Sequence, residues 1–260
     1  DNHLRFGVLS RTAALLAGKQ TNTSWKPDVL HVHDWQTALA PVYLSLNPDA
    51  KTKTLLTIHN IAYRGIFSPA VMESLGLPVR LYSVNGVEFF GDISFLKGGI
   101  FYSQALSTVS PTHANEIQQP AGGFGLHGLL SARASNLHGI LNGADYDTWN
   151  PETDTALFCN YSHYTLDGKT LNKKALLRDL EMDCAPNRPL FGSVGRLNHD
   201  KGSDLLLAGL KAIIRAGGQV VVLGSGQRNL ENALTSFARA HAQNVRVKIG
   251  YDETLAHRII

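Results

Sequence analysis

The sequence of 260 residues has little cysteine, no long apolar run and almost no excess of charge. Cys159 and Cys184 are its only cysteines, too few for a disulfide scaffold or a cysteine-rich zinc site. No segment approaches the ~20 consecutive apolar residues that a membrane-spanning helix needs. The net charge of +3 comes without a dense Lys or Arg run, which argues against a nucleic-acid-binding surface. We therefore expect a protein of a reducing compartment, such as the cytoplasm or a plastid stroma, that binds neither nucleic acid nor membrane.

The composition suits a globular protein with a substantial core, because 43% of the residues are hydrophobic and 17% are charged. Residues 1–18 have the pattern of an amphipathic helix that is already under way. At the other end, Ile259 and Ile260 stop inside an apolar run without a capping residue. We therefore expect the sequence to be an internal portion of a longer protein.

Short β-branched runs alternate with helical patterns, which is typical of parallel α/β architecture. Between the two halves, residues 142–189 are poor in strand patterns and contain a charged helix around residues 173–181. We predict two Rossmann-like, doubly wound domains, residues 1–142 and 143–260, the second of which begins with an interdomain crossing. The predicted strands are 28–33, 55–59, 105–110, about 138–141, 190–194, 219–223 and 245–249, and the predicted helices include 36–46, 203–216, 227–241 and one that begins at Pro111.

The loop GRLNHDKG, residues 195–202, follows a predicted strand and precedes a helix that Ser203 could cap. Ligands of open α/β sheets bind at the carboxyl ends of strands, and a helix N-terminus offers free N–H groups and a partial positive charge. Together with Arg196 and Lys201, this position makes a compact site for a diphosphate. The alternative is a solvated loop whose two cations face water, and the spacing alone favours neither interpretation.

A second glycine-containing loop, Gly224-Ser225-Gly226, follows the next predicted strand. Glycine allows a backbone to approach a ligand closely. However, Asn229 stands where a dinucleotide fingerprint needs its third glycine, so the motif by itself favours a tight structural turn. Its position beside the Arg196 loop favours a ligand contact.

The first predicted strand ends in His31-Val32-His33-Asp34. Two histidines at positions i and i+2 lie on one strand face, a spacing that metal sites use. No second cluster of ligand-type residues follows, so we favour buried, hydrogen-bonded histidines, or a carbohydrate contact by Asp34 and Trp35, over a metallohydrolase. We expect no bound metal; a measurement of bound metal distinguishes these alternatives.

Polar side chains also follow two other predicted strands. His59 and Asn60 end the second strand, where they could bond sugar hydroxyls or phosphate oxygens, or where the histidine could satisfy a loop backbone. Asn142 and Gly143 follow the fourth strand, where Asn-Gly is commonly turn chemistry. The residues alone thus predict a two-domain α/β protein with an anionic, nucleotide-like ligand.

Taken together and in their order, eight segments resemble the glycogen and starch synthases that use ADP-glucose. LLTIHNIAYRGIF is similar to the family segment THN-x-AYQG, and PDVLHVHDWQTALAP to its HDW segment. The set covers nearly the whole chain and is far more specific than any single motif. The remaining six segments are NGVEFFGDISFLKGGIFYS, ALSTVSPTHANEI, GILNGADYDTWNPETD, SVGRLNHDKGSDLL, VVVLGSG and KIGYDETLAHRI.

The resemblance implies a GT-B fold, in which two Rossmann-like domains face each other across a cleft. It implies a retaining glucosyltransferase that moves glucose from ADP-glucose to the non-reducing end of an α-1,4-glucan and needs no cofactor. Residues 1–142 would form the acceptor side, and residues 143–260 would bind the nucleotide sugar. By the same resemblance Arg196 and Lys201 would grip the diphosphate and His59 would sit by the transferring glucose. Substrate contacts would come from Asp34, Asn60, Asn142, Gly224, Gly226 and Tyr251.

The sequence departs from the family at several points. The family's Lys-x-Gly-Gly-Leu donor loop and its Glu-x-Phe-Glu-Pro-Cys-Gly-Leu motif are absent, so the piece by itself is expected to be inactive. Gln36 and Gln227 stand where many members have a histidine and an acidic residue. Two further alternatives stay open: a GT-B transferase that uses UDP-glucose, and a non-catalytic glucan-binding relative. A non-catalytic relative would need no intact donor site, so the presence of His59, Arg196 and Lys201 argues against it.

Overall fold

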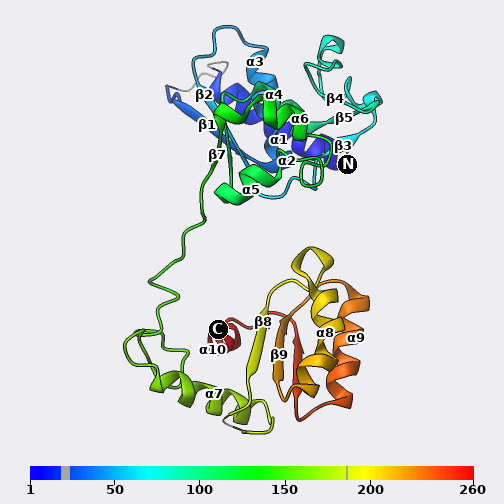
Figure 1. The fold of residues 1–260 in the computed structure, drawn as a ribbon. Helices are drawn as coiled ribbons and strands as arrows, with labels where there is room; N and C mark the ends of the chain where they lie inside the picture. Colours follow the sequence, from blue (N-terminus) through cyan, green and yellow to red (C-terminus); the bar gives the residue numbers. More distant parts are fainter. Residues whose placement is uncertain (19–23, 186) are drawn as a thin grey trace. The chain divides into compact units, whose positions relative to one another are not determined.

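The computed structural model describes residues 1–18, 24–185 and 187–260. The chain forms two compact units, Asp1–Gly143 and Ala144–Ile260 (Figure 1), and each contains a parallel β-sheet with helices packed against it. The α/β class predicted from the sequence is confirmed. Among the described residues, no helix combines the length and the apolar character that crossing a membrane requires.

The first unit is built on a four-stranded parallel sheet with the order β1-β2-β6-β7. Alternate residues of β2, namely Thr54, Leu56 and Ile58, are buried, so the strand keeps the period of two that one covered face imposes. The predicted strands of this half are confirmed, with ends shifted by up to two residues. They are β1 (Val29–His33), β2 (Lys53–Ile58), β6 (Ala105–Thr108) and β7 (Leu137–Gly139).

A second, antiparallel sheet of this unit was not predicted. Its strands, β3 (Ile66–Phe67), β4 (Glu88–Phe89) and β5 (Asp92–Ser94), have two or three residues each, too few to show an alternating pattern. Helix α4 (Phe95–Tyr102) was also missed, because it contains two consecutive glycines. A side chain at Gly99 would lie 2.7 Å from the Cβ atom of Ala38, so glycine there permits close helix packing.

The other helices of the first unit surround the parallel sheet (Figure 1). The helix predicted over residues 36–46 is in fact two helices, α2 (Asp34–Thr37) and α3 (Leu39–Ser45). Helix α5 begins at Pro111 as predicted, and the side chain of Ser110 caps it by accepting from the His113 amide. The remaining members are α1 (Asn2–Ala17), α5 (Pro111–Glu116), α6 (His127–Ala132) and three 3₁₀ turns, η1 (Pro69–Val71), η2 (Val79–Leu81) and η3 (Ala134–Asn136).

The second unit contains a three-stranded parallel sheet with the order β10-β9-β8. Its middle strand β9 is buried along its whole length. Val220 and Val222 pack in a core with residues of α8 and α9, whereas Val221 packs with Leu177 of α7. Helices therefore cover both faces of the sheet. The elements are α7 (Asp167–Asp179), β8 (Leu190–Val194), η4 (His199–Lys201), α8 (Ser203–Arg215), β9 (Gln219–Gly224), α9 (Arg228–Ala240), β10 (Val245–Ile249) and α10 (Glu253–Ile259).

The segment that opens the second unit is fastened to its last helix. Oδ2 of Asp154 lies 2.7 Å from Nδ1 of His257, the side chain of His257 is buried and that of Asp154 is nearly so, and the ring of Trp149 stacks on His257 at 3.9 Å. Burial disfavours the charged carboxylate, but hydrogen bonds from His257 and from the Ala156 amide outweigh it, and the pKa of Asp154 lies below its ordinary value. This buried pair joins parts of the unit that are far apart in sequence.

Candidate active site

In the first unit the candidate residues meet at the carboxyl ends of β1 and β2. Oδ1 of Asp34 accepts the backbone N–H of His59 at 2.7 Å and that of Asn60 at 3.4 Å. Its Oδ2 lies 3.0 Å from Nδ1 of His59. A carboxylate only accepts hydrogen bonds, so Nδ1 carries the proton and Nε2 is the ring nitrogen turned to other partners. Asp34 thus fixes both the loop and the ring of His59.

Asp34 itself has a positive φ of 52°, which is uncommon outside glycine. The short polar side chain of aspartate tolerates this conformation better than a bulky one. Asn60 is engaged in a turn of its own, since its Oδ1 accepts the Ala62 amide at 3.0 Å. Sequence reasoning grouped Asp34 with the substrate contacts and missed that it orients His59. Their separation by 25 residues hides the contact from any local pattern.

The two histidines of β1 extend this site into a row of three rings. Ring centroids are 4.2 Å apart for His31 and His33 and 5.4 Å apart for His33 and His59. Nε2 of His31 lies 2.7 Å from the hydroxyl of Thr57. The shared strand face is confirmed, but the expectation of burial was wrong, because both side chains are exposed. Although His31 is exposed, partial desolvation of its ring, followed by the neighbouring histidine charges, lowers the pKa of His31.

No group of three or more His, Cys, Asp or Glu side chains is placed to hold a metal ion in the part of the chain that the structure describes. Trp35 packs against the core of the first unit. It is half-buried and packs against the core rings of Phe6, Phe67 and Phe95, with centroid distances of 4.9, 5.9 and 6.3 Å. The alternative of a carbohydrate contact by Asp34 and Trp35 stays a prediction.

In the second unit three of the candidate residues line a pocket of about 210 Å³ at the carboxyl ends of all three strands, whereas Lys201 and Gly226 do not line it. Arg196 follows β8, Gly224 ends β9 and Tyr251 follows β10. This edge is where open α/β sheets bind their ligands. The volume is below the ~300–1,000 Å³ of a complete small-molecule site, which suits part of a nucleotide sugar.

The glycines of the second loop bring this loop against the loop that carries Arg196. A Cβ atom on Gly224 would lie 1.8 Å from the carbonyl oxygen of Gly195, and one on Gly226 would lie 2.2 Å from that of Leu197. Backbone hydrogen bonds hold the loops together, from Gly195 to Leu223 and from Leu197 to Ser225, both 3.0 Å long. These glycines therefore serve the tight turn, because only a residue without a side chain lets the two loops pack this closely. The packing holds the loop that carries Arg196 in place.

Gly224→Ala is therefore expected to destabilise the protein by several kcal/mol, since the backbone of residue 195 cannot yield as a flexible side chain could (about 1–3 kcal/mol for overpacking alone). The matched control is Gly209→Ala within α8, where nothing lies within 4 Å of the added methyl group. That change should stabilise the helix by up to about 1 kcal/mol. Urea unfolding of both variants measures the contrast; equal stabilities would contradict the close loop packing.

The start of α8 differs from the expectation. Ser203 is not the cap: Gly202, with a φ of 70°, takes that position, and Oδ1 of Asn198 instead accepts the Lys201 amide at 3.0 Å. The Asp204 carboxylate lies 3.2 Å from His199. The hydrogen bond from His199 lowers the pKa of Asp204. Burial acts in the opposite direction, but nearby backbone amides also stabilise the carboxylate, and the pKa stays below its ordinary value. A negative side chain thus stands at this helix N-terminus.

Arg196 and Lys201 are both exposed on this loop. Tyr251 is exposed, and its hydroxyl donates to Oε2 of Glu253 at 3.3 Å; the charge of Glu253 is the main reason that the pKa of Tyr251 is raised. Asn142 lies exposed two residues before the second unit begins. The roles predicted for these residues stay predictions.

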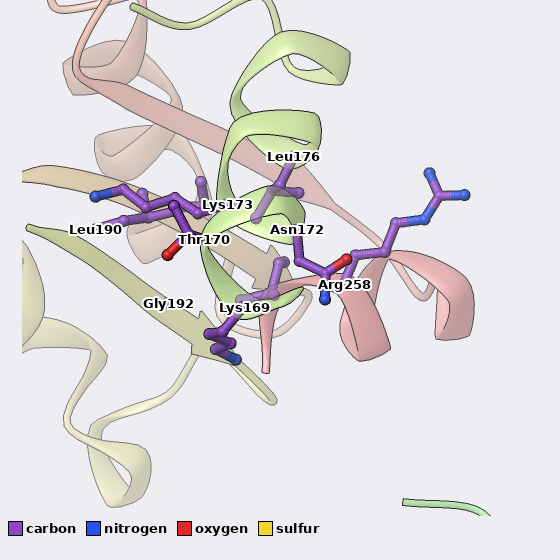
Figure 2. A pocket seen from close by; sticks show the side chains of 10 residues that line it. Lys169, Thr170, Asn172, Lys173, Leu176, Leu190, Gly192 and Arg258 are labelled. Atoms are coloured by element: carbon purple, nitrogen blue, oxygen red, sulfur yellow. The ribbon is translucent and has the colours of Figure 1, made fainter. Parts of the chain in front are cut away.

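A larger pocket, of about 350 Å³, lies elsewhere in the second unit (Figure 2). Lys169, Asn172 and Leu176 line it from α7, and Gly192 lines it from β8. It contains none of the predicted site residues and does not lie at the ligand-binding edge of the sheet. Nζ of Lys169 donates to the backbone carbonyl of Ile260 at 2.5 Å. The larger volume therefore does not make it the active site.

Comparison with known proteins identifies the family to which the chain belongs. The family model for the starch synthase catalytic domain matches residues 1–132. The chain is 48% identical over 261 residues to a glycogen synthase of Paramagnetospirillum magneticum and 47% identical over 259 residues to one of Nitrosospira multiformis. All of the chain is covered in both alignments, against 53% and 52% of the relatives, so the chain spans about half of their length.

A solved structure, the catalytic domain of starch synthase IV from Arabidopsis thaliana bound to ADP and acarbose, is 34% identical to the chain with a TM-score of 0.87. That match covers all of the chain and 54% of the plant protein. The fold is thus α/β of the GT-B glycosyltransferase type, as the resemblance implied. Within that class, the chain belongs to the starch synthase catalytic domain family.

Proposed function

We propose that this chain is part of a retaining glucosyltransferase that extends an α-1,4-glucan with glucose from ADP-glucose. The observation that carries the proposal is the pocket at the carboxyl ends of β8, β9 and β10, lined by Arg196 and Tyr251. The Arabidopsis structure holds ADP and acarbose, a nucleotide and an oligosaccharide analogue, which supports two substrates of these classes here. We place the function in the cytoplasm, or in the stroma if the source is a plant.

The chemistry follows from where charge develops. Breaking the bond between C1 of glucose and the diphosphate creates positive charge on the sugar and negative charge on the leaving group. Arg196 and Lys201 would stabilise that negative charge, the part that a metal ion takes in other nucleotide-sugar enzymes. The 4-hydroxyl of the acceptor then attacks C1 from the face that ADP leaves, its proton passes to a phosphate oxygen of the departing ADP, and the configuration is retained.

The residues of the first unit would act on the sugar. His59, oriented through Nδ1 by Asp34, would present Nε2 to the transferring glucose. In this proposal residues 1–142 serve the acceptor side, and residues 143–260 hold the nucleotide sugar. Asn142, Gly224, Gly226 and Asn60 would shape the donor and acceptor contacts through loop geometry.

The proposal predicts that the intact protein prefers ADP-glucose to UDP-glucose as donor. Transfer of labelled glucose to glycogen from each donor, at matched concentrations, measures the ratio of kcat/KM. The bases differ, so the discrimination should be at least about tenfold, equivalent to roughly 1.4 kcal/mol. Equal or better use of UDP-glucose would favour the alternative GT-B transferase, and the absence of transfer from either would favour a non-catalytic glucan binder.

A further inference from the structure

The first unit carries an aromatic patch that the proposed chemistry does not use. We define it as Phe89, Phe90 and Phe124, together with Arg64. Phe90 is 80% exposed and Phe124 is 46% exposed, whereas Phe89 is buried beneath them. The rings of Phe89 and Phe90 meet edge to face, with centroids 4.7 Å apart. Large exposed rings grouped in this way mark binding surfaces.

The patch is one assembly, although its members come from three segments of the chain. The Arg64 guanidinium lies over the rings of Phe89 and Phe124, 5.9 and 5.7 Å from their centroids. Arg64 Nη1 also donates to the carbonyl of Phe124 at 2.9 Å. A Cβ atom added at Gly125 would lie 3.0 Å from both the Phe89 and Phe90 rings. Glycine at position 125 therefore lets the segment of Phe124 approach the other two rings.

Both exposed rings stand on a strained backbone. Phe90 and Phe124 have φ values of 50° and 48°, a region that bulky residues avoid. Around Phe90 the turn is held by hydrogen bonds to both peptide groups of Gly91: its carbonyl accepts from the Tyr82 hydroxyl at 2.8 Å, and its amide donates to Glu88 at 2.9 Å. Glycine or asparagine would adopt these conformations at a lower conformational free energy. An exposed ring gains little packing energy to offset the strain. Such strain is found at ligand-binding positions.

Arg64 gives the patch a polar element. Its Nε is buried and has no hydrogen-bond partner within the described residues, although buried polar groups are nearly always paired. It also stands where the family segment AYQG has glutamine. The half-buried guanidinium lies beside the rings, so a ligand with an apolar face and hydrogen-bonding oxygens at its edge suits this surface.

We propose that the aromatic patch binds the α-glucan acceptor at glucose units remote from the reacting end; this inference rests on the proposed function. A glucose unit has an apolar C–H face and a rim of hydroxyl groups, the combination that rings and a guanidinium recognise. Arg64 lies five residues after His59 on one loop, so the two are at most about 18 Å apart. A glucan whose end is at His59 can reach the patch, whereas a disaccharide acceptor occupies only the end nearest to the chemistry.

The test compares Phe90→Asn and Phe124→Asn with the wild-type intact protein. Asparagine accepts a positive φ, so the backbone can keep its path while the ring is lost. We expect the Kd for maltoheptaose, measured by titration calorimetry without donor, to rise at least tenfold. The melting temperature should be unchanged or higher, because strain is relieved. Phe158→Asn, which removes a ring that is 72% exposed in the second unit, is the matched control and should bind as wild type does.

Kinetics give a second readout. With maltoheptaose as acceptor, both patch variants should show a higher KM at unchanged kcat, whereas with maltose neither constant should change. An unchanged Kd for maltoheptaose in both variants would overturn the patch proposal, even if ADP-glucose is used normally. If the patch variants instead convert a dimer to a monomer with glucan affinity intact, the surface is a self-association site and the proposal is wrong. Failure of wild type to transfer glucose, with the Kd changes present, would overturn only the proposed function.

Discussion

Arg196→Ala in the intact protein is expected to lower kcat by about a hundredfold or more, with little change in the melting temperature. Removing one preorganised group that stabilises transition-state charge costs on the order of 3 kcal/mol. Because the negative charge grows as the sugar–phosphate bond breaks, the loss should appear mainly in kcat rather than in KM. The side chain is exposed, so the folded state should lose little. Lys201→Ala should behave in the same way.

Two variants sharpen this experiment. Arg196→Lys keeps the charge but loses the planar fork that bonds two phosphate oxygens, so its activity should lie between wild type and Arg196→Ala. Lys211→Ala is the control: it removes an exposed cation from α8, the helix that begins after Lys201, and it should leave turnover unchanged. Near-normal kcat for both Arg196→Ala and Lys201→Ala would show that the two cations face water and take no part in the reaction.

Asp34→Asn is expected to reduce kcat by about a hundredfold while most of the stability is kept. An asparagine oxygen can still accept the His59 amide, and asparagine tolerates the positive φ at this position. Its NH₂ group, however, cannot accept the proton of Nδ1, so the ring of His59 loses its fixed tautomer and orientation. Kinetics and thermal unfolding of one preparation separate these two effects.

Asp34→Ala extends the comparison, because it also removes the acceptor for the backbone N–H groups of His59 and Asn60. We expect the same loss of activity and, in addition, about 1–3 kcal/mol of stability. Asp49→Asn, an exposed carboxylate of the same unit, is the control and should change neither quantity. If Asp34→Asn retained full turnover, the carboxylate would have only a structural role in the loop.

The sequence predicts those elements whose pattern of apolar residues matches their burial in the folded protein. Strand β9, QVVVLG, is buried on both faces and reads as a continuous apolar run, so its position was predicted to within one residue. Helix α4 was missed because two glycines lower its intrinsic propensity, while its burial against Ala38 is a tertiary effect. The short strands β3, β4 and β5 exist because neighbouring segments pair, not because of an internal pattern.

The same division applies to the candidate site. Arg196 and Tyr251 follow predicted strands, and because parallel strands end at one edge, their presence at one pocket could be expected. The hydrogen bonds that Asp34 accepts from His59 could not be expected, since they depend on the register of β1 against β2 and on an unusual φ at Asp34. Likewise, the glycines at positions 224 and 226 looked suited to a ligand, but the atoms that they make room for belong to the adjacent loop.

The buried contact between Asp154 and His257 also bears on how the protein is made. The two residues are 103 positions apart, so Asp154 is synthesised well before His257 and cannot form this contact until His257 has been added. At about 5–20 residues per second, the ribosome needs roughly 5–20 s to supply it. The first unit has a core of its own and can fold during that interval. Until His257 emerges, Trp149 lacks the ring on which it stacks in the folded protein.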